Sequence, residues 1–397
     1  MQQELFIKQT EINILEDLFQ AYFDARKNKR NTINALAFEK RFESNLFELH
    51  EEIISRNYKP NPSICFVVNK PVKREIFAAD FRDRVVHHLI YNYISPIFEK
   101  HFINDAYSCR IGKGTHYGIN RIDRFIRSCS MNYSKEAYIL KLDIKGYFMS
   151  INKTILYKKV LSILNQSKHI NCFNFDLVKY LIEQTIFNNP TNNCRIKGSK
   201  SDWIGLPANK SLFGSSVNCG LPIGNLTSQL FGNIYLSCFD NYVKRDLGIK
   251  YYGRYVDDFI LIHKDKDYLK SLIPSIRKFL SDVLELELHS NKIYLQSVRN
   301  GVKYLGAVIK PYRKYISMRT KGSFNQAIKN HNLLFVENAF DKDLFPHFIS
   351  SMNSYLGILK HYKTYRLRNK LMFKSLSPLF FSYFSLDKEI RKFAILV

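Results

Sequence analysis

The stretch that decides the fold reads Tyr251-Tyr252-Gly253-Arg254-Tyr255-Val256-Asp257-Asp258-Phe259-Ile260-Leu261-Ile262. Two adjacent acids, Asp257 and Asp258, stand between two apolar runs, which predicts a hairpin with both acids at its tip. Burying acids among aliphatic side chains is costly unless they have partners, and carboxylate oxygens are ligands that magnesium prefers. We therefore expect this hairpin tip to hold metal.

A third acid ends another apolar strand, because Asp143 closes Tyr138-Ile139-Leu140-Lys141-Leu142-Asp143. Three acids on separate strand ends predict a phosphoryl-transfer site in which two Mg²⁺ ions about 4 Å apart activate a 3′-hydroxyl and stabilise the leaving pyrophosphate. Mn²⁺ could replace them. We expect Asp143 and Asp257 to bridge the ions and Asp258 to contribute less. The alternative that one or more of these acids, Asp258 above all, is a solvated turn residue stays open. The expected metal ligands are Asp143, Ile144, Asp257 and Asp258.

Composition points to a large globular protein with a polyanionic partner. The chain has 397 residues, is 46% hydrophobic and carries a formal charge of +25. Such an excess attracts nucleic acid and makes binding salt-dependent, although a charge that serves only solubility stays open. Residues 301–397 hold 17 Lys or Arg against five acids, interleaved with tyrosines. That pattern is typical of a surface that follows a phosphate backbone and stacks on bases.

The hydrophobic pattern predicts an α+β catalytic body followed by an all-helical basic tail. Expected helices cover residues 1–58, 80–103, 151–187 and 227–242, expected strands cover 64–68, 138–143, 251–262 and 302–309, and residues 188–220 form the one long irregular region. No apolar stretch reaches about 18 residues, which predicts no membrane partner and a cytoplasmic location. The composition suits a bacterial or phage-encoded protein.

A turn with two glycines leads into the predicted helix at 227–242. It reads Gly220-Leu221-Pro222-Ile223-Gly224-Asn225-Leu226-Thr227-Ser228-Gln229, where glycine permits close approach by a ligand. An aspartate strand, a Leu-Pro-x-Gly turn and Tyr-Val-Asp-Asp, in this order, resemble the reverse transcriptases from about Asn69 to Ala307. The resemblance implies a right-hand polymerase that makes cDNA from template RNA, a primer and dNTPs. The domains would be a helical extension (1–58), interleaved fingers with a palm built on an antiparallel sheet (59–310), and a basic helical thumb (311–397).

The resemblance also assigns residues to the substrates. Arg74 should grip the incoming triphosphate, because arginine binds phosphate through paired donors. Phe148 should close off the 2′ side of the sugar and so favour deoxynucleotides, unless it is ordinary core. Lys292 is the expected proton donor to pyrophosphate. The other nucleotide-binding candidates are Lys70, Lys73, Ile223 and Gly224. The primer and template candidates are Arg110, Lys113, Tyr255, Gln229, Tyr304, Leu305 and Gly306; Arg110 could instead tie the fingers together.

Two positions in the glycine turn separate subfamilies, because retroviral members carry Gln and Pro where this chain has Ile223 and Gln229. With residues 203–207 and 210–213, this pattern is similar to reverse transcriptases of diversity-generating retroelements. That likeness implies copying with errors at adenines and a small helical accessory protein, presumed oligomeric, as partner. Gly232 departs from the pattern, which usually has Ala. An enzyme of antiphage defence, a group II intron-like enzyme and a catalytically vestigial RNA-binding protein stay open as alternatives.

Overall fold

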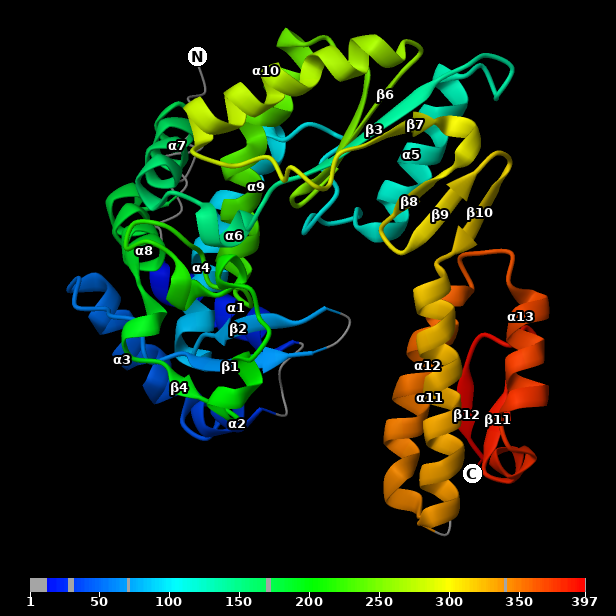
Figure 1. The fold of residues 1–397 in the computed structure, drawn as a ribbon. Helices are drawn as coiled ribbons and strands as arrows, with labels where there is room; N and C mark the ends of the chain where they lie inside the picture. Colours follow the sequence, from blue (N-terminus) through cyan, green and yellow to red (C-terminus); the bar gives the residue numbers. More distant parts are fainter. Residues whose placement is uncertain (1–12, 28–31, 70–71, 169–172, 339–340, 397) are drawn as a thin grey trace, which may run out of the picture. The chain divides into compact units, whose positions relative to one another are not determined.

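The computed structural model describes residues 13–27, 32–69, 72–168, 173–338 and 341–396 (Figure 1). The α-helices are α1 (Ile14–Arg26), α2 (Ile33–Glu39), α3 (Phe42–Ile54), α4 (Phe81–His101), α5 (Thr115–Cys129), α6 (Tyr147–Ser150), α7 (Lys153–Asn165), α8 (Phe175–Phe187), α9 (Leu226–Asn241), α10 (Lys266–Leu284), α11 (Met318–Glu337), α12 (Phe345–Leu359) and α13 (Tyr365–Lys370). The strands are β1 (Ile64–Val68), β2 (Arg74–Ala78), β3 (Tyr138–Asp143), β4 (Arg195–Ile196), β5 (Tyr251–Tyr255), β6 (Asp258–His263), β7 (Tyr294–Ser297), β8 (Val302–Tyr304), β9 (Ala307–Lys310), β10 (Arg313–Ile316), β11 (Phe384–Leu386) and β12 (Phe393–Ile395). This mixture confirms the expected α+β class.

The described residues form two compact units. The first draws on the ranges Met1–Arg110, Lys141–Phe259 and Ser271–Ile293, and the second on Ile111–Leu140, Ile260–Lys270 and Tyr294–Val397. Within the part of the chain that the structure covers, no helix is both long and apolar enough to cross a membrane. The predicted division at residues 58 and 310 stays a prediction.

Two antiparallel strands, β1 and β2, form the first sheet with the short strand β4. Their register pairs Ile64 with Ala78 and Val68 with Arg74, and β4 adds to β1 in parallel. Side chains alternate between the two faces of a strand. Arg74 is exposed and Glu75 is buried, so they point to opposite faces of β2.

Helix α4 begins at an N-cap, where the Asp80 carboxylate accepts a hydrogen bond from the amide of Arg82. Helix α1 packs along α4 and ties to it through polar contacts, in which Tyr93 donates to Asp17 at 2.6 Å and Asn92 donates to Asp24 at 3.0 Å. The helical character predicted for the N-terminal region is therefore confirmed for its described residues.

The sheet that carries the acids has the strand order β5-β6-β3-β7. Strand β3, which ends at Asp143, is the neighbour of β6, which begins at Asp258. Helix α9 buries an aromatic side chain against the hairpin, since the Phe239 ring lies 5.1 Å from that of Phe259. The predicted hairpin, the adjacent aspartate strand and the helix that precedes them are all confirmed.

Two expectations about helical segments are wrong in part. Residues 151–187 form two helices, α7 and α8, because Asn174 caps a new helix start by accepting from the amide of Leu177. The C-terminal tail is not all helical, because β11 and β12 form an antiparallel hairpin. The Asp387 carboxylate stabilises the turn of this hairpin by accepting from the amide of Lys392 at 2.8 Å.

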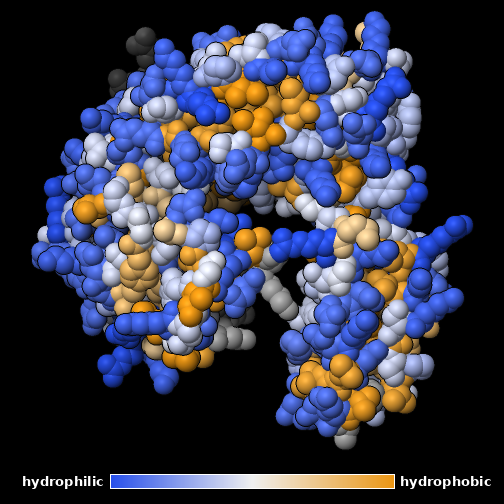
Figure 2. All heavy atoms as spheres, viewed as in Figure 1, coloured by the Kyte–Doolittle hydropathy of each residue, from blue (hydrophilic) through white to orange (hydrophobic). Residues whose placement is uncertain are grey.

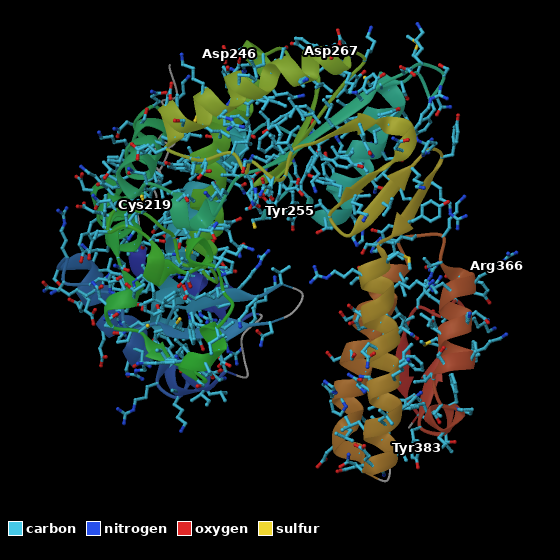
Figure 3. All side chains as sticks on the ribbon, viewed as in Figure 1. Cys219, Asp246, Tyr255, Asp267, Arg366 and Tyr383 are labelled. Atoms are coloured by element: carbon cyan, nitrogen blue, oxygen red, sulfur yellow. The ribbon has the colours of Figure 1, made fainter. Side chains whose placement is uncertain are left out.

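Helices α11 and α12 run side by side in the tail and share an aromatic core with α13 and the β11–β12 hairpin (Figure 1). Figure 2 shows hydrophilic and apolar residues mixed on the viewed face of this tail. Lys321, Lys363 and Arg366 are exposed, and Figure 3 shows Arg366 on α13. Arg368 is instead buried and donates to the backbone oxygen of Glu389 at 2.6 Å. Not every cation of the basic run is therefore open to a polyanion.

Candidate active site

The two adjacent acids lie at the turn between β5 and β6. Val256 takes a positive φ of 55°, which lets the chain reverse within two residues and sets Asp257 at the tip. The amide of Ile144 donates to the backbone oxygen of Asp257 at 3.2 Å. This bond ties the end of β3, with Asp143, to the hairpin tip, so the three predicted acids lie at the adjoining ends of β3 and of the β5–β6 hairpin.

Two lysines contact the acids. Lys292 places its Nζ 2.7 Å from Oδ1 of Asp143, and Lys141 places its Nζ 2.9 Å from Oδ2 of Asp258. Lys141 and Asp143 share one face of β3, because they are two residues apart on a strand. Lys292 was predicted at this site and Lys141 was not. The sequence feature that could have revealed Lys141 is its position between two buried leucines on the strand.

Burial makes the acids costly to ionise. Burial, followed by the negative charge of Asp143, raises the pKa of Asp257 to about 6. Burial also raises the pKa of Asp258, and the neighbouring Lys141 partly offsets this shift. Within the described part of the chain, Oδ1 of Asp258 is buried and has no hydrogen-bond partner. A buried, unpaired carboxylate oxygen beside two other acids is the donor set that a divalent cation would satisfy.

The side chains as they lie do not yet enclose an ion. Among the described residues, no three His, Cys, Asp or Glu side chains are grouped closely enough to hold a metal. Each of the two lysines instead holds one carboxylate oxygen. Ile144 has a buried apolar side chain, so it could offer a metal only its backbone oxygen. In their chemistry and location these residues fit a divalent metal.

A buried ion pair supports the hairpin from behind. Nε and Nη2 of Arg254 each lie 2.7 Å from a different oxygen of Asp240, and both side chains are fully buried. Nη1 of Arg254 donates to the backbone oxygen of Val256 at 2.9 Å, next to the tip of the hairpin. Tyr252 donates to the same Asp240 carboxylate at 2.7 Å. The sequence analysis did not predict this ion pair. The feature that could have indicated it is Arg254, a cation within an otherwise apolar strand.

The segment before Arg110 lies along β5. The amide of Tyr107 donates to the oxygen of Arg254, and the amide of Arg254 donates to the oxygen of Asp105, both at 2.9 Å. A Cβ at Gly253 would collide with the Tyr107 hydroxyl, so only glycine fits there. The amide of Val256 donates to Oγ of Ser108 at 3.1 Å. Residues 105–108 therefore help to fix the hairpin that carries Asp257 and Asp258.

Phe148 and Ile223, two of the predicted nucleotide-binding residues, pack against one apolar cluster. Its buried members are Cys65, Phe77, Met149 and Leu212, and Trp203 and Cys194 also pack on it. The oxygen of Ile223 accepts from the amide of Phe77 at 2.9 Å. Gly224 has a φ of +125°, and a Cβ there would lie 3.0 Å from Cγ2 of Ile76. Both the backbone conformation and the lack of space favour glycine at this position. Phe148, Ile223 and Gly224 thus gather at β2.

The predicted basic side chains near β2 differ in what they contact. Arg74 is exposed, on the same face of β2 as Ile76. Nζ of Lys73 donates to the backbone oxygen of Ile204 at 2.7 Å. Lys70 lies outside the described residues. Of the two described cations, Arg74 is the more exposed.

Gly232, where the family pattern usually has Ala, lies under the Phe148 ring. A Cβ at Gly232 would lie 3.3 Å from Cε1 of Phe148, which is tighter than an ordinary contact. The Tyr147 hydroxyl donates to the backbone oxygen of Gly232. The missing methyl group therefore lets Phe148 approach α9 closely, so the departure noted in the sequence bears on a predicted sugar contact.

Arg110, a predicted primer or template contact, is held inside the protein. Its Nε lies 2.9 Å from a carboxylate oxygen of Glu99, and its Nη1 donates to the oxygens of Ile103 and Ala106 at 2.7 and 2.9 Å. Its side chain is only 5% exposed. These contacts favour the alternative in which Arg110 ties a loop together.

The other predicted primer or template residues lie at four places: on α9, on β5, before α5, and at the turn between β8 and β9. Gln229 is exposed on α9, and Tyr255 is half-buried at the end of β5 (Figure 3). In the second unit, Lys113 lies over the Tyr117 ring at 5.7 Å. Leu305 and Gly306, both with positive φ, form the tight turn between β8 and β9, whereas the Tyr304 side chain is buried. A primer contact at this turn would come from residues 305 and 306 or from the backbone.

Comparisons with known proteins identify the family of this chain. The family model described as "Reverse transcriptase (RNA-dependent DNA polymerase)" matches residues 68–309, a range that includes all three acids and both lysines. Protein YkfC of Escherichia coli is 22% identical over 329 residues, with 74% of this chain and 79% of that protein covered. The match confirms the expected right-hand polymerase family. It does not separate the subfamilies.

Two solved structures are also similar to the chain. An apo telomerase from Candida tropicalis, truncated of its C-terminal domain, has a TM-score of 0.44 and 14% identity, with 68% of this chain covered. A telomerase from Candida albicans in complex with a fragment of telomeric RNA has a TM-score of 0.44 and 11% identity, with 79% of this chain covered. The chain spans only 59% and 60% of the length of these two proteins.

Proposed function

We propose a function for this chain from its family, since it belongs to the reverse transcriptases, the RNA-dependent DNA polymerases. The proposed activity is synthesis of cDNA from deoxynucleotides on a template RNA. The observation that carries this proposal is the placement of Asp143, Asp257 and Asp258 at the adjoining ends of β3 and of the β5–β6 hairpin, where Oδ1 of Asp258 is buried without a partner among the described residues. Intact acids of this kind argue against a vestigial RNA-binding protein.

The proposed metal ligands are the carboxylates of Asp143, Asp257 and Asp258 with the backbone oxygen of Ile144. When bound, two divalent ions would favour loss of the proton from the attacking 3′-hydroxyl and stabilise charge on the leaving pyrophosphate. Asp258 is the weaker ligand, because Lys141 holds one of its oxygens. Lys292 has a half-exposed ammonium on Asp143, from which it can deliver a proton to the pyrophosphate.

The incoming deoxynucleotide would lie against β2. Arg74 would bind the triphosphate with its exposed guanidinium, helped by Lys73 and Lys70, because charge-assisted hydrogen bonds to phosphate are strong. Phe148 would stand beside the sugar and exclude a ribose 2′-hydroxyl. Gly224 would let the base pair approach the turn, and Ile223 would offer it an apolar side chain without hydrogen bonds.

The primer and template would follow the exposed basic side chains and the tight turns. Gln229, Tyr255 and Lys113 are proposed contacts, together with the turn at Leu305 and Gly306. The +25 charge makes this binding electrostatic in large part, so it should weaken steeply as salt rises.

Primer extension tests the proposed activity. The wild-type chain is mixed with an RNA template annealed to a DNA primer, then given dNTPs with Mg²⁺, Mn²⁺ or a chelator. Extension with either metal, and none with the chelator or with ribonucleotides, is expected. Binding of RNA without any extension under all these conditions would favour the vestigial RNA-binding alternative.

We further propose that the chain serves a diversity-generating retroelement and copies adenines with errors. The support is Ile223, whose aliphatic side chain packs against the same apolar cluster as Phe148 and stands where retroviral members have a Gln that could make hydrogen bonds near the nascent pair. A small helical accessory protein would be its partner. Sequencing cDNA made from the native template with this partner present tests the proposal, with Ile223→Gln as the matched variant. Substitutions enriched opposite adenine are expected; faithful copying would favour a defence or intron-like role.

A further inference from the structure

A buried carboxylate on β2 lies outside the site described so far. Glu75 is fully buried and accepts three hydrogen bonds, from Nε1 of Trp203 at 2.6 Å, Oγ of Ser211 at 2.7 Å and the amide of Leu212 at 2.6 Å. Three donors offset the cost of burying this acid. One side chain thereby fixes two places in residues 199–214, which we call the clamped segment.

The clamped segment has little regular structure of its own. It consists of three short 3₁₀ turns, at Lys200–Trp203, Ala208–Lys210 and Leu212–Gly214, joined by a turn and irregular residues. Its internal backbone hydrogen bonds are local turn bonds, such as that from the amide of Asp202 to the oxygen of Ser199 at 2.9 Å, so contacts from outside help to fix its position. Glu75 supplies such contacts at both the first and the last of the three turns.

The same strand carries the cation proposed for the triphosphate. Glu75 and Arg74 are consecutive and point to opposite faces of β2, and Lys73 donates to the oxygen of Ile204 inside the clamped segment. The position of Arg74 along β2 and the position of the clamped segment are therefore coupled through three consecutive residues. Loss of the Glu75 contacts would loosen both.

The clamped segment also contacts the turn between Asp143 and Phe148. Gly146, which has a φ of +56°, lies so close that a Cβ there would be 2.7 Å from the backbone oxygen of Asn209. Leu212 is buried in the apolar cluster against which Phe148 packs. Both proposed nucleotide contacts, at Arg74 and at Phe148, therefore adjoin this one segment.

We propose that the clamped segment is a wall of the nucleotide site and that Glu75 is the positioning residue that holds it there. The inference rests on the proposed polymerase function. Glu75 touches no substrate; it acts through Trp203, Ser211 and Leu212 on the surfaces that flank the triphosphate and the sugar. Its loss should weaken binding of the incoming dNTP more than it slows the chemical step.

The chain provides its own optical reporter, because Trp203 is the sole tryptophan. Its indole donates directly to Glu75, so a change in the clamp changes the surroundings of the fluorophore. Titration of the wild type, bound to an RNA template and a dideoxy-terminated primer, with the complementary dNTP should give a saturable change in Trp203 emission. No change at saturating dNTP would overturn the inference.

The variant Glu75→Gln keeps the shape of the side chain and removes its charge. Its KM for the dNTP should rise about tenfold, the factor for one lost hydrogen bond to a charged group, while kcat stays within about threefold. Acrylamide should quench Trp203 emission more strongly than in the wild type. Ser211→Ala, which removes one donor and disturbs the fold less, should raise the same KM by a smaller factor.

The matched control is Glu183→Gln, since Glu183 is an exposed carboxylate on α8 that accepts from one tyrosine hydroxyl. It should change neither KM nor emission. If Glu75→Gln and Ser211→Ala alter Trp203 emission but leave the dNTP KM unchanged, the clamp is structural only and the inference is wrong. If the wild type extends no primer, the proposed function is wrong, and the dNTP titration of Trp203 alone decides the inference.

Discussion

Breaking the buried Arg254–Asp240 pair should destabilise the protein more than any exposed ion pair does. Asp240→Asn removes the charge that faces two guanidinium nitrogens at 2.7 Å and leaves a cation buried. Removal of one partner of such a pair costs about 3–5 kcal/mol, because the remaining charge is uncompensated. Asp240 also accepts from Tyr252, so that hydroxyl loses its charged partner.

Urea denaturation followed by Trp203 fluorescence measures this cost, because Trp203 and Asp240 belong to the same compact unit. Glu287→Gln is the control, since Glu287 pairs with Lys145 at 2.8 Å at a largely exposed site. Exposed pairs contribute about 0–1 kcal/mol. The double variant Asp240→Asn/Arg254→Met should lose less unfolding free energy than the sum of the losses in the two single variants. A loss for Asp240→Asn no larger than that of the control would refute the reasoning.

Three further predictions follow from single contacts. Gly232→Ala should change the ratio of dNTP to rNTP incorporation, because its methyl group would press on the Phe148 ring at 3.3 Å; in a Phe148→Val background the change should vanish, and persistence there would count against a steric route. Burial, followed by the charge of His347, lowers the pKa of His331 to about 4, below the unfolded value near 6.5. The unfolded chain therefore binds the extra proton, so stability is complete above about pH 6.5 and falls toward pH 4; thermal unfolding should show this slope, and His331→Leu should flatten it. Asn152→Ala removes the cap that accepts from two amides at the start of α7 and should cost about 1 kcal/mol in urea denaturation, with an unchanged midpoint as the contrary result.

The three proposed catalytic acids stand out in the sequence because they interrupt strong apolar patterns. Asp143, Asp257 and Asp258 end or begin strands whose other residues are aliphatic, and the structure has strands at those positions. Helices with a clear apolar face, such as α4 and α9, were predicted to within two residues. Local pattern and local structure agree at these elements because their burial is regular.

The supporting residues were harder to predict because their partners are distant in the sequence. Glu75 meets Trp203 and Ser211 across more than a hundred residues, and Lys141 meets Asp258 across a strand pairing that no local pattern specifies. The β11–β12 hairpin was missed for a related reason, since two three-residue strands are too short to show a period. Such features follow from tertiary contacts and not from local propensity.

The central claim is that Asp257 holds metal that drives templated DNA synthesis. Its most direct test is the rate of single-nucleotide incorporation by Asp257→Asn across a Mg²⁺ titration, with Asp267→Asn, an exposed acid on α10, as the control. The Asp257 variant should be slower by on the order of a thousandfold, which corresponds to ~4 kcal/mol of lost transition-state stabilisation, while the control keeps the wild-type rate. A rate for Asp257→Asn within a few-fold of wild type at every Mg²⁺ concentration would contradict the account.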